Sequence, residues 1–239
     1  MDLTHLSASL AGIVDADRVR LGVATPESFP EVRSEIQRRT ESGERGGLGF
    51  VYRDPDRATR PLHSFPWARS ILVAAVGYLA DGDGVGDPET RSVARFADGD
   101  RYEDLRTVVG HLAAVIADGG HRAEVVLDDD RLVDRAVAIR SGVAWWGKST
   151  MAITPGLGPW FLIGSVVTDL DLAPTRPMDR TCGTCIACIP ACPTDAIVEP
   201  GVLDARRCLA AILQGRGSIP RGLRRAVGAR VYGCDDCLT

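Results

Sequence analysis

The first 181 residues of this 239-residue chain contain no cysteine, and all seven cysteines lie after them. Cysteines spread in pairs along a whole chain indicate a secreted disulfide scaffold, which this distribution excludes. A tight cluster of cysteines is instead typical of a metal site in a reducing compartment. The sequence therefore predicts a metal-binding segment in its C-terminal part.

Long hydrophobic runs and a basic, apolar leader are also missing. The longest apolar run, Ile71 to Ala80, is too short to cross a bilayer. Asp2 stands where a signal peptide carries positive charge, and no apolar segment follows it. We therefore expect a soluble, cytoplasmic, monomeric protein that contacts no membrane. The four histidines are scattered, and we assign them no role.

The chain as a whole has no excess of basic residues, because its net charge is −4. Residues 201–239 differ: seven arginines and three aspartates give this segment +4 and leave −8 for the rest. A local basic patch fits a phosphate backbone. A solvated helix face would have the same composition, so both interpretations stay open.

Apolar runs and helical periodicity alternate in the first part of the chain, which predicts an α/β domain with a central sheet. Strands are expected at residues 71–77, 123–127 and 160–168, and helices at 2–15, 101–117 and 131–141. The Gly-rich and polar stretches 40–66 and 81–100 are expected to be long loops. A linker at about 172–181 divides the chain into a domain of residues 1–172 and a cysteine domain of residues 173–239.

Four cysteines follow the spacing C-x2-C-x2-C-x3-C-P, which is typical of bacterial ferredoxins. They are Cys182, Cys185, Cys188 and Cys192, with Pro193 after the last. The first three thiolates would bind one cubane and the fourth would bind the other. Zinc sites usually consist of two C-x2-C pairs, so the pattern favours iron–sulfur clusters. Residues 194–197 fit a ferredoxin helix that leads to a strand.

The remaining cysteines, Cys208, Cys234 and Cys237, make a second set of four with Cys192. Two [4Fe–4S] clusters need eight thiolates, and the chain has seven. The first cluster therefore lacks one cysteine ligand, and we expect the second cluster to be the stable one. A longer parent chain would supply the missing cysteine, and a non-cysteine ligand or a three-iron cluster is the alternative.

Residues 142–149 (GVAWWGKS) match the P-loop pattern G-x-x-x-x-G-K-[ST]. A P-loop follows a buried strand and opens a helix, whereas the residues before Gly142 have helical periodicity. Two tryptophans fill the loop, and Pro155 with Gly156 would stop a following helix. We therefore expect no nucleotide site here.

Three consecutive aspartates end the predicted strand 123–127. Asp130 is a candidate N-cap for the helix 131–141. Asp128 directly follows the last apolar strand residue, a position that faces the ligand crevice in α/β sheets. Apolar tryptophans and the charges of Asp129 and Asp130 are expected to raise the pKa of Asp128, which could then donate a proton.

Taken together, these motifs resemble the epoxyqueuosine reductase family, cobalamin-dependent iron–sulfur enzymes related to reductive dehalogenases. The resemblance runs from about Arg57 to the last residue. Its strongest parts are Asp128 with DRA at 134–136, GVAWWGK at 142–148, Thr154 with Pro155, the run from Cys182, LDARRC at 203–208 and YGCDDC at 232–237.

The resemblance implies a cobalamin-binding domain of α/β (α+β) class followed by a ferredoxin-like domain with two [4Fe–4S] clusters. The clusters would take electrons from an external donor and pass them singly to cobalt. Reduced cobalt would attack the epoxide of a modified base in a tRNA anticodon loop, and Asp128, which matches the family's proton donor, would protonate the oxygen. The implied cofactor contacts are Asp128 itself, Lys148, Ala152, Thr154 and Ile163, with Arg57 and Arg95 near further contact positions.

The chain departs from the family at several positions. Arg131 stands where a proline is usual, Ser149 where asparagine is common, and Val143-Ala144 where the family has Leu-Gly. The family's C-terminal helical repeats and its last cysteine have no counterpart here. Two alternatives follow: a related cobalamin and iron–sulfur reductase that acts on another small electrophile, and a ferredoxin-type electron carrier that is not an enzyme.

Overall fold

The apolar run at residues 71–77 forms the central strand of a sheet. The computed structural model of the protein describes residues 1–79 and 93–239. In it, strand β2 (Ser70–Gly77) is buried at all eight positions, as expected for a strand with neighbours on both edges and helices on both faces. The strand prediction for this run is therefore confirmed.

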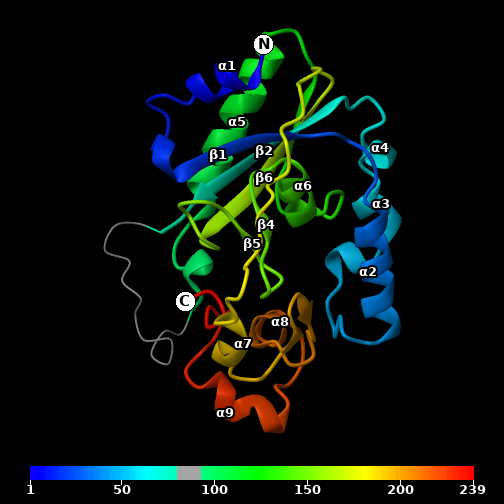
Figure 1. Ribbon diagram of the computed structural model, residues 1–239, viewed down its shortest axis with the longest axis vertical. Helices are drawn as coiled ribbons and strands as arrows, with labels where there is room; N and C mark the ends of the chain where they lie inside the picture. The colour runs from blue at the N-terminus through cyan, green and yellow to red at the C-terminus, as the bar shows by residue number, and fades with distance from the viewer. Residues whose placement is uncertain (80–92) are drawn as a thin grey trace.

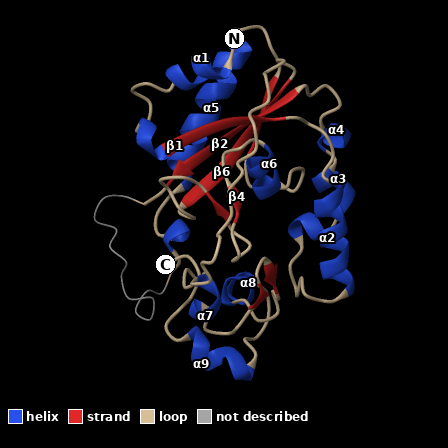
Figure 2. Ribbon diagram, viewed as in Figure 1, coloured by secondary structure: helices blue, strands red, loops and turns tan. Residues whose placement is uncertain are grey.

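The sheet has the order β1-β2-β6-β3, and every neighbouring pair is antiparallel (Figure 2). Its other strands are β1 (Val19–Ala24), β3 (Ala123–Val126) and β6 (Phe161–Thr168). The predictions at 123–127 and 160–168 are confirmed, whereas β1 was not predicted because Arg20 and Gly22 interrupt its apolar pattern. Since the sheet is antiparallel, the rule that parallel strands end at one ligand-binding edge does not apply to Asp128.

Successive side chains of β2 point to opposite faces of the sheet, so each face has its own core. Alternate residues from Ile71 belong to a core with helix α6 (Asp134–Arg140). Alternate residues from Leu72 belong to a second core with α5 (Tyr102–Asp118) and α1 (Leu3–Ala8). Figure 1 shows the sheet between these two helical layers, with the cysteine segment beyond one end.

The stretch 40–66 is not one long loop, contrary to prediction. It holds the end of α2 (Pro30–Glu41), a 3-10 helix η2 (Phe50–Tyr52), α3 (Pro55–Thr59) and α4 (Pro61–Ser64). Both α3 and α4 begin with proline. A proline in the first turn loses no intrahelical hydrogen bond, so the residues that suggested a loop start helices instead.

The helix predictions hold with changed boundaries. The helix expected at 101–117 is α5, and the helix expected at 2–15 is shorter, since α1 ends at Ala8 and only the 3-10 helix η1 (Ala16–Arg18) follows before β1. Of the loop expected at 81–100, residues 81–92 lie outside the described residues. The remainder contains the 3-10 helix η3 (Arg95–Ala97).

The helix expected at 131–141 begins only at Asp134, and Asp130 is not its N-cap. Val133 holds the N-cap position and makes no side-chain capping bond. The carboxylate of Asp130 instead pairs with Arg57, with 3.4 Å between Oδ1 and Nη2.

The linker expected at about 172–181 contains no helix or strand. The cysteine segment then holds short elements: α7 (Cys188–Ala191), β7 (Ile197–Glu199), β8 (Val202–Leu203), α8 (Leu209–Gln214), the 3-10 helix η4 (Arg221–Leu223) and α9 (Arg224–Val227). The helix expected after Pro193 is wrong, because α7 precedes that proline and a turn follows it. The strand expected next is β7. Within the described residues, no helix is long and apolar enough to span a membrane.

Two glycines test this packing. A Cβ on Gly22 in β1 would overlap the Ser141 carbonyl oxygen and come within 2.8 Å of Val143 Cγ2, whereas a Cβ on exposed Gly110 in α5 would meet nothing within 4 Å. We predict that Gly22→Ala lowers the free energy of unfolding by about 1–3 kcal/mol through overpacking. Gly110→Ala should raise it by up to about 1 kcal/mol through helix propensity. Denaturant titration measures both, and equal stabilities for the two variants would contradict the packing of β1 against the end of α6.

Candidate functional site

The first three cysteines of the ferredoxin-type run lie in a short loop and at the start of α7. The Cys185 N–H donates to the Cys182 carbonyl oxygen at 3.0 Å, which curls the loop. Burial raises the pKa of the Cys188 thiol, and the neighbouring Cys182 and Cys185 thiols raise it further. The three thiols predicted to bind the first cluster are therefore gathered within electrostatic range.

The four thiols predicted to bind the second cluster are also gathered. Burial raises the pKa of Cys237 to about 12, and Cys234, Cys208 and Cys192 push it in the same direction. Burial likewise raises the pKa of Cys234 to about 11. Such thiols keep their protons in water at neutral pH and become thiolates when a metal takes the place of the proton.

Backbone N–H groups already point at these sulfur atoms. The Ala196 N–H donates to Cys192 Sγ at 3.2 Å. N–H groups of residues 210 and 211 bond to Cys208, and that of residue 236 bonds to Cys234, each favouring the thiolate. N–H···S bonds of this kind tune iron–sulfur clusters.

Among the described residues, no group of three or more His, Cys, Asp or Glu side chains has the geometry to hold a single metal ion. A cubane makes a different demand, because each thiolate binds a different iron. Both groups of thiols therefore remain candidate cluster sites.

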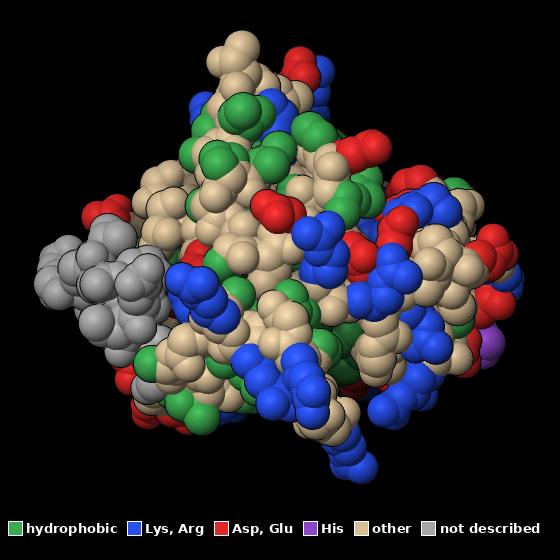
Figure 3. Space-filling view, turned by 90° about the horizontal axis from the view of Figure 1, so that it is seen from below, with side chains coloured by type: hydrophobic (Ala, Val, Ile, Leu, Met, Phe, Trp, Pro, Cys, Tyr) green, Lys and Arg blue, Asp and Glu red, His purple; other side chains and the backbone are tan. Residues whose placement is uncertain are grey.

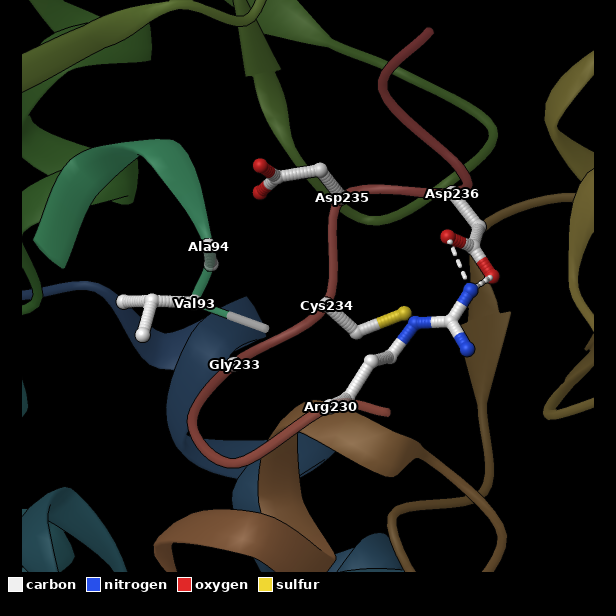
Figure 4. A pocket seen from close by; sticks show the side chains of 7 residues that line it. All are labelled: Val93, Ala94, Arg230, Gly233, Cys234, Asp235 and Asp236. Carbon is white, nitrogen blue, oxygen red and sulfur yellow. Dashed lines mark hydrogen bonds and ion pairs between the residues drawn. The ribbon is translucent and has the colours of Figure 1, made fainter. Parts of the chain in front are cut away.

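A buried ion pair holds the C-terminal cysteine loop. Arg230 Nη2 donates to both carboxylate oxygens of Asp236, at 2.9 and 2.8 Å, and the two side chains are only 9% and 10% exposed. Figure 4 shows this pair beside Cys234, with Asp235 on the other side of the loop. There Asp235 Oδ2 accepts a hydrogen bond from the Arg95 N–H at 2.8 Å. The loop between the last two cysteines is thus fixed from both sides.

The segment that resembles a P-loop folds as a β-hairpin. Helix α6 precedes it, as predicted, and β4 (Trp145–Trp146) pairs with β5 (Ala152–Ile153). Strand β5, not a helix, is the next element after Ser149, so the N–H groups are not arranged around a phosphate at a helix start. The predicted context is confirmed, while the expectation that no nucleotide binds stays a prediction.

The turn of this hairpin contacts the cysteine segment. Lys148 Nζ donates to the carbonyl oxygens of Gly183 and Cys185, at 2.7 and 2.9 Å. The Lys148 carbonyl oxygen accepts from the Gly201 N–H at 2.8 Å. One residue of the turn therefore binds both the first cysteine loop and the turn between β7 and β8.

A cleft of about 470 Å³ lies between α2, α6 and the hairpin. Its wall combines apolar surface, including the 47% exposed Trp146 and Phe50, with charged groups. The Oδ1 atom of Asp134 in this wall is fully buried and has no hydrogen-bond partner in the described part of the chain. Arg135 beside it donates from Nη1 to the Thr150 carbonyl oxygen at 2.9 Å, which fixes the hairpin turn.

Asp128 is placed differently from the sequence expectation. It is exposed, not buried near tryptophans, and has a positive φ of 50° that turns the chain directly after β3. The negative charges expected to act on it are paired: Asp129 bonds to Arg131, whose Nη2 lies 2.7 Å from Oδ2, and Asp130 pairs with Arg57. The loop from Asp128 leads to residues 132–134 in the wall of the cleft.

None of the seven predicted cofactor contacts is among the described residues that line the cleft. Lys148, Ala152 and Thr154 belong to the hairpin and its flank, of which Trp146, Gly147 and Thr150 line the cleft. Ala152 and Thr154 are buried, and the Thr154 hydroxyl donates to the Val143 carbonyl oxygen at 3.0 Å. Ile163 on β6 is partly buried against the α6 core. These assignments stay predictions.

The two arginines of that set lie apart from the hairpin. Arg57 is half-exposed and pairs with Asp130. Arg95 is 4% exposed, and its guanidinium carbon lies 4.8 Å from the centroid of the Trp160 ring. Arg95 thereby joins the start of β6 to the C-terminal cysteine loop.

Asp134 is the titratable group that sequence reasoning did not single out. Burial raises its pKa to about 7, and the nearby negative charge of Asp128 raises it further. The sequence offered a weak signal, a lone carboxyl before the apolar face of α6. That its Oδ1 atom is buried without a hydrogen-bond partner could be seen only in the structure.

The basic segment 201–239 has two kinds of arginine. Arg206, Arg207 and Arg230 pair with aspartates. Four others are exposed and form no ion pair with another described residue: Arg216, Arg221, Arg224 and Arg225. Figure 3 looks at the molecule from this end and shows several Lys and Arg side chains on it. A solvated face and a phosphate-binding face both remain compatible with this surface.

Asp134 gives a pH-dependent prediction for the protein purified without cobalamin. The pKa is about 3.9 in an unfolded chain and about 7 in the folded one. The folded state therefore binds the proton more tightly, and the free energy of unfolding falls as pH rises from about 4 to about 7. Asp134→Asn should flatten this decline between pH 5 and pH 8, as measured by urea unfolding.

Asp129→Asn is the matched control, because hydrogen bonds from Arg131 lower the pKa of Asp129. Asp129 is then ionised in both states above pH 5, and its variant should keep the wild-type slope. An unchanged slope in Asp134→Asn would contradict the assignment.

Residues 181–239 match a family model described as a 4Fe-4S double cluster binding domain. The epoxyqueuosine reductase of Vibrio cholerae is 32% identical over 212 residues, covering 84% of this chain and 57% of the relative. The solved epoxyqueuosine reductase from Streptococcus thermophilus superposes with a TM-score of 0.86 at 25% identity, covering 100% of this chain and 65% of that one.

A solved epoxyqueuosine reductase with an epoxyqueuosine-modified tRNA-Tyr stem loop superposes with a TM-score of 0.82 at 27% identity. It covers 99% of this chain and 64% of that one. The chain spans 57% to 59% of the length of the curated relatives that it matches. The resemblance drawn from the motifs is confirmed, since the chain is similar in sequence and structure to epoxyqueuosine reductases along nearly its whole length.

Proposed function

We propose that the chain is the cofactor-binding part of a reductase that converts epoxyqueuosine in tRNA to queuosine. Residues 1–172 would form the cobalamin-binding domain and residues 173–239 the iron–sulfur domain. The observation that carries this proposal is the superposition of 99% of the chain on an epoxyqueuosine reductase that holds an epoxyqueuosine-modified tRNA stem loop.

The proposed reaction sets the demands on the chain. Removal of an epoxide oxygen as water consumes two electrons and two protons. Iron–sulfur clusters carry one electron at a time, so two clusters fed by an external donor suit a two-electron reduction. Seven thiols in two groups, with N–H donors aimed at three sulfur atoms of the second group, support this role.

The four thiols of the second group should hold a [4Fe–4S] cluster without help from any other chain. We predict that Cys208→Ser, after anaerobic reconstitution, loses about the iron and sulfide of one cluster. Cys182→Ser is the matched control, because it removes a ligand of the first group and should keep the stable cluster. Iron and sulfide analysis with the cluster absorption spectrum measures both. If Cys208→Ser keeps the stable cluster, Cys208 is not one of its ligands and the assignment of the second group is wrong.

Cobalamin fits the cleft by its chemistry. A corrin has a broad apolar ring edged with primary amides, and the wall offers exposed Trp146 and Phe50 together with the unpartnered Asp134 Oδ1. The resemblance assigns further contacts, outside this lining, to Lys148, Ala152 and Thr154 of the hairpin and to Ile163, Arg57 and Arg95. When bound there, cobalamin would supply a nucleophilic reduced cobalt for opening the epoxide.

Asp128 is the proposed proton donor to the leaving oxygen. A positioned acid contributes roughly 10²–10⁴-fold to such a step. Asp128 is exposed, so bound cofactor and substrate would have to shield its carboxyl from water. Its neighbour Asp129 is unsuited to this role, because Arg131 lowers the pKa of Asp129 and keeps it ionised.

Asp128→Asn should therefore retain cobalamin binding and cluster spectra but lose turnover of epoxyqueuosine-modified tRNA by about 10²-fold or more. Asp129→Asn has the same change in charge one residue away and should lose much less. Single-turnover assays with a modified stem loop measure both variants. Near-normal turnover in Asp128→Asn would remove Asp128 from the mechanism.

The same assays separate the alternative functions. A reductase for another small electrophile would bind cobalamin and leave the modified stem loop unchanged. An electron carrier would take up clusters and bind no cobalamin. The exposed arginines at 216–225 are suited to contact tRNA phosphates. If they do, binding of the stem loop should weaken steeply as the salt concentration rises.

A further inference from the structure

Lys148 is the only lysine in the chain, whose other 27 basic residues are arginines. It lies in the turn between β4 and β5, in the segment that resembles a P-loop. No phosphate-binding role explains it there, since the segment is a hairpin. Its contacts lead instead to the cysteine segment.

The ammonium group of Lys148 is bound by two carbonyl oxygens of the first cysteine loop. The distances are 2.7 Å to Gly183 and 2.9 Å to Cys185, typical of charge-assisted hydrogen bonds. A compact ammonium with three donors can bridge two carbonyls on one curled loop, which the planar fork of arginine does less well. The contact holds the loop that carries two of the three thiols of the first group.

The main chain at Lys148 is fixed independently of the side chain. The Gly201 N–H donates to the Lys148 carbonyl oxygen at 2.8 Å, the Gly147 N–H donates to the Met151 carbonyl oxygen at 2.8 Å, and Arg135 holds the Thr150 carbonyl. The ammonium is therefore extended toward the cysteine loop from a turn that is itself braced. Because the turn is fixed, the Lys148 ammonium would lie at a defined distance from a cluster bound by the cysteine loop.

We propose that Lys148 is a positioning residue for the first cluster: its ammonium fixes the Cys182–Cys185 loop to the hairpin, and its charge raises the reduction potential of the cluster bound there. The proposal rests on the proposed function only in that Cys182, Cys185 and Cys188 hold a cluster. A nearby positive charge favours the reduced cluster, which carries one more negative charge. The hairpin that forms a wall of the cleft thereby also controls the adjacent electron carrier.

The test is a redox titration of the anaerobically reconstituted full chain, followed by electron paramagnetic resonance. Lys148→Met should lower the midpoint potential of the first cluster and leave that of the second unchanged. Lys148→Arg, which keeps the charge, should show a smaller shift. Arg180→Met removes a charge two residues before Cys182 from a side chain stacked on Trp145, and should also show a smaller shift than Lys148→Met.

A second measurement does not depend on any Lys148 variant being stable. Lysine labelled with ¹³C at Cε gives one signal in this protein. In the reconstituted wild type, that signal should be displaced or broadened by the unpaired electrons of the first cluster. Cys182→Ser should remove the effect and Cys208→Ser should leave it.

Three results would overturn the proposal: no shift of the first potential in Lys148→Met, equal shifts in Lys148→Met and Arg180→Met, or a lysine signal that ignores the first cluster. Failure of the proposed function is distinguishable, because a chain that binds no cobalamin or leaves the modified stem loop unchanged would still take up clusters and show the effects of Lys148.

Discussion

The docking of the cysteine segment onto the sheet domain is the constraint on which the rest of the structure depends. In the proposed reductase, electrons would reach a cofactor in the cleft only if the thiols are held near it. Backbone hydrogen bonds make the attachment at three separate places: the Ala94 N–H to Tyr232, the Gly201 N–H to Lys148, and the Ala205 N–H to Glu44, the last at 2.7 Å. Because the bonds are between main chains, many side-chain substitutions can change the surface without changing the docking.

The two groups of thiols differ in their surroundings. The second group is partly buried at all four cysteines, receives backbone N–H bonds and lies beside the Arg230–Asp236 ion pair. The first group is more open, with Cys185 exposed and Lys148 at its loop. Burial, hydrogen bonds to sulfur and nearby charge are the factors that set cluster potentials, so one fold can hold two clusters of the same type at different potentials.

Much of this arrangement could be predicted from sequence. The spacing of the cysteines reports their ligand chemistry directly, and the apolar run of β2 reports a strand buried on both faces. Strand β1 was not predicted, because Arg20 and Gly22 break its apolar pattern. A glycine is needed at position 22 because the residues after α6 pack closely against the strand there. Helices α3 and α4 were not predicted, because the sequence alone does not distinguish a proline at a helix start from a proline in a loop.

The environment of each carboxyl could not be read from sequence either. The consecutive aspartates suggested mutual repulsion around Asp128, whereas Asp129 pairs with the neighbouring Arg131 and Asp130 pairs with Arg57 from a distant part of the chain. Asp134 has a raised pKa instead, and its unpartnered oxygen depends on how α6 meets the cleft. Burial and pairing are tertiary properties, so a motif can name the residue types of a site without fixing their protonation.

The central claim is that one chain holds a cobalamin site and two cluster sites in electronic contact. The most direct measurement is the absorption spectrum of the anaerobically reconstituted chain after incubation with cobalamin, removal of free cobalamin and stepwise reduction. The account predicts that about one cobalamin per chain stays with the protein and that its bands change as the clusters are reduced. Loss of all cobalamin from a chain that retains its clusters, or bands that do not respond to cluster reduction, would contradict it.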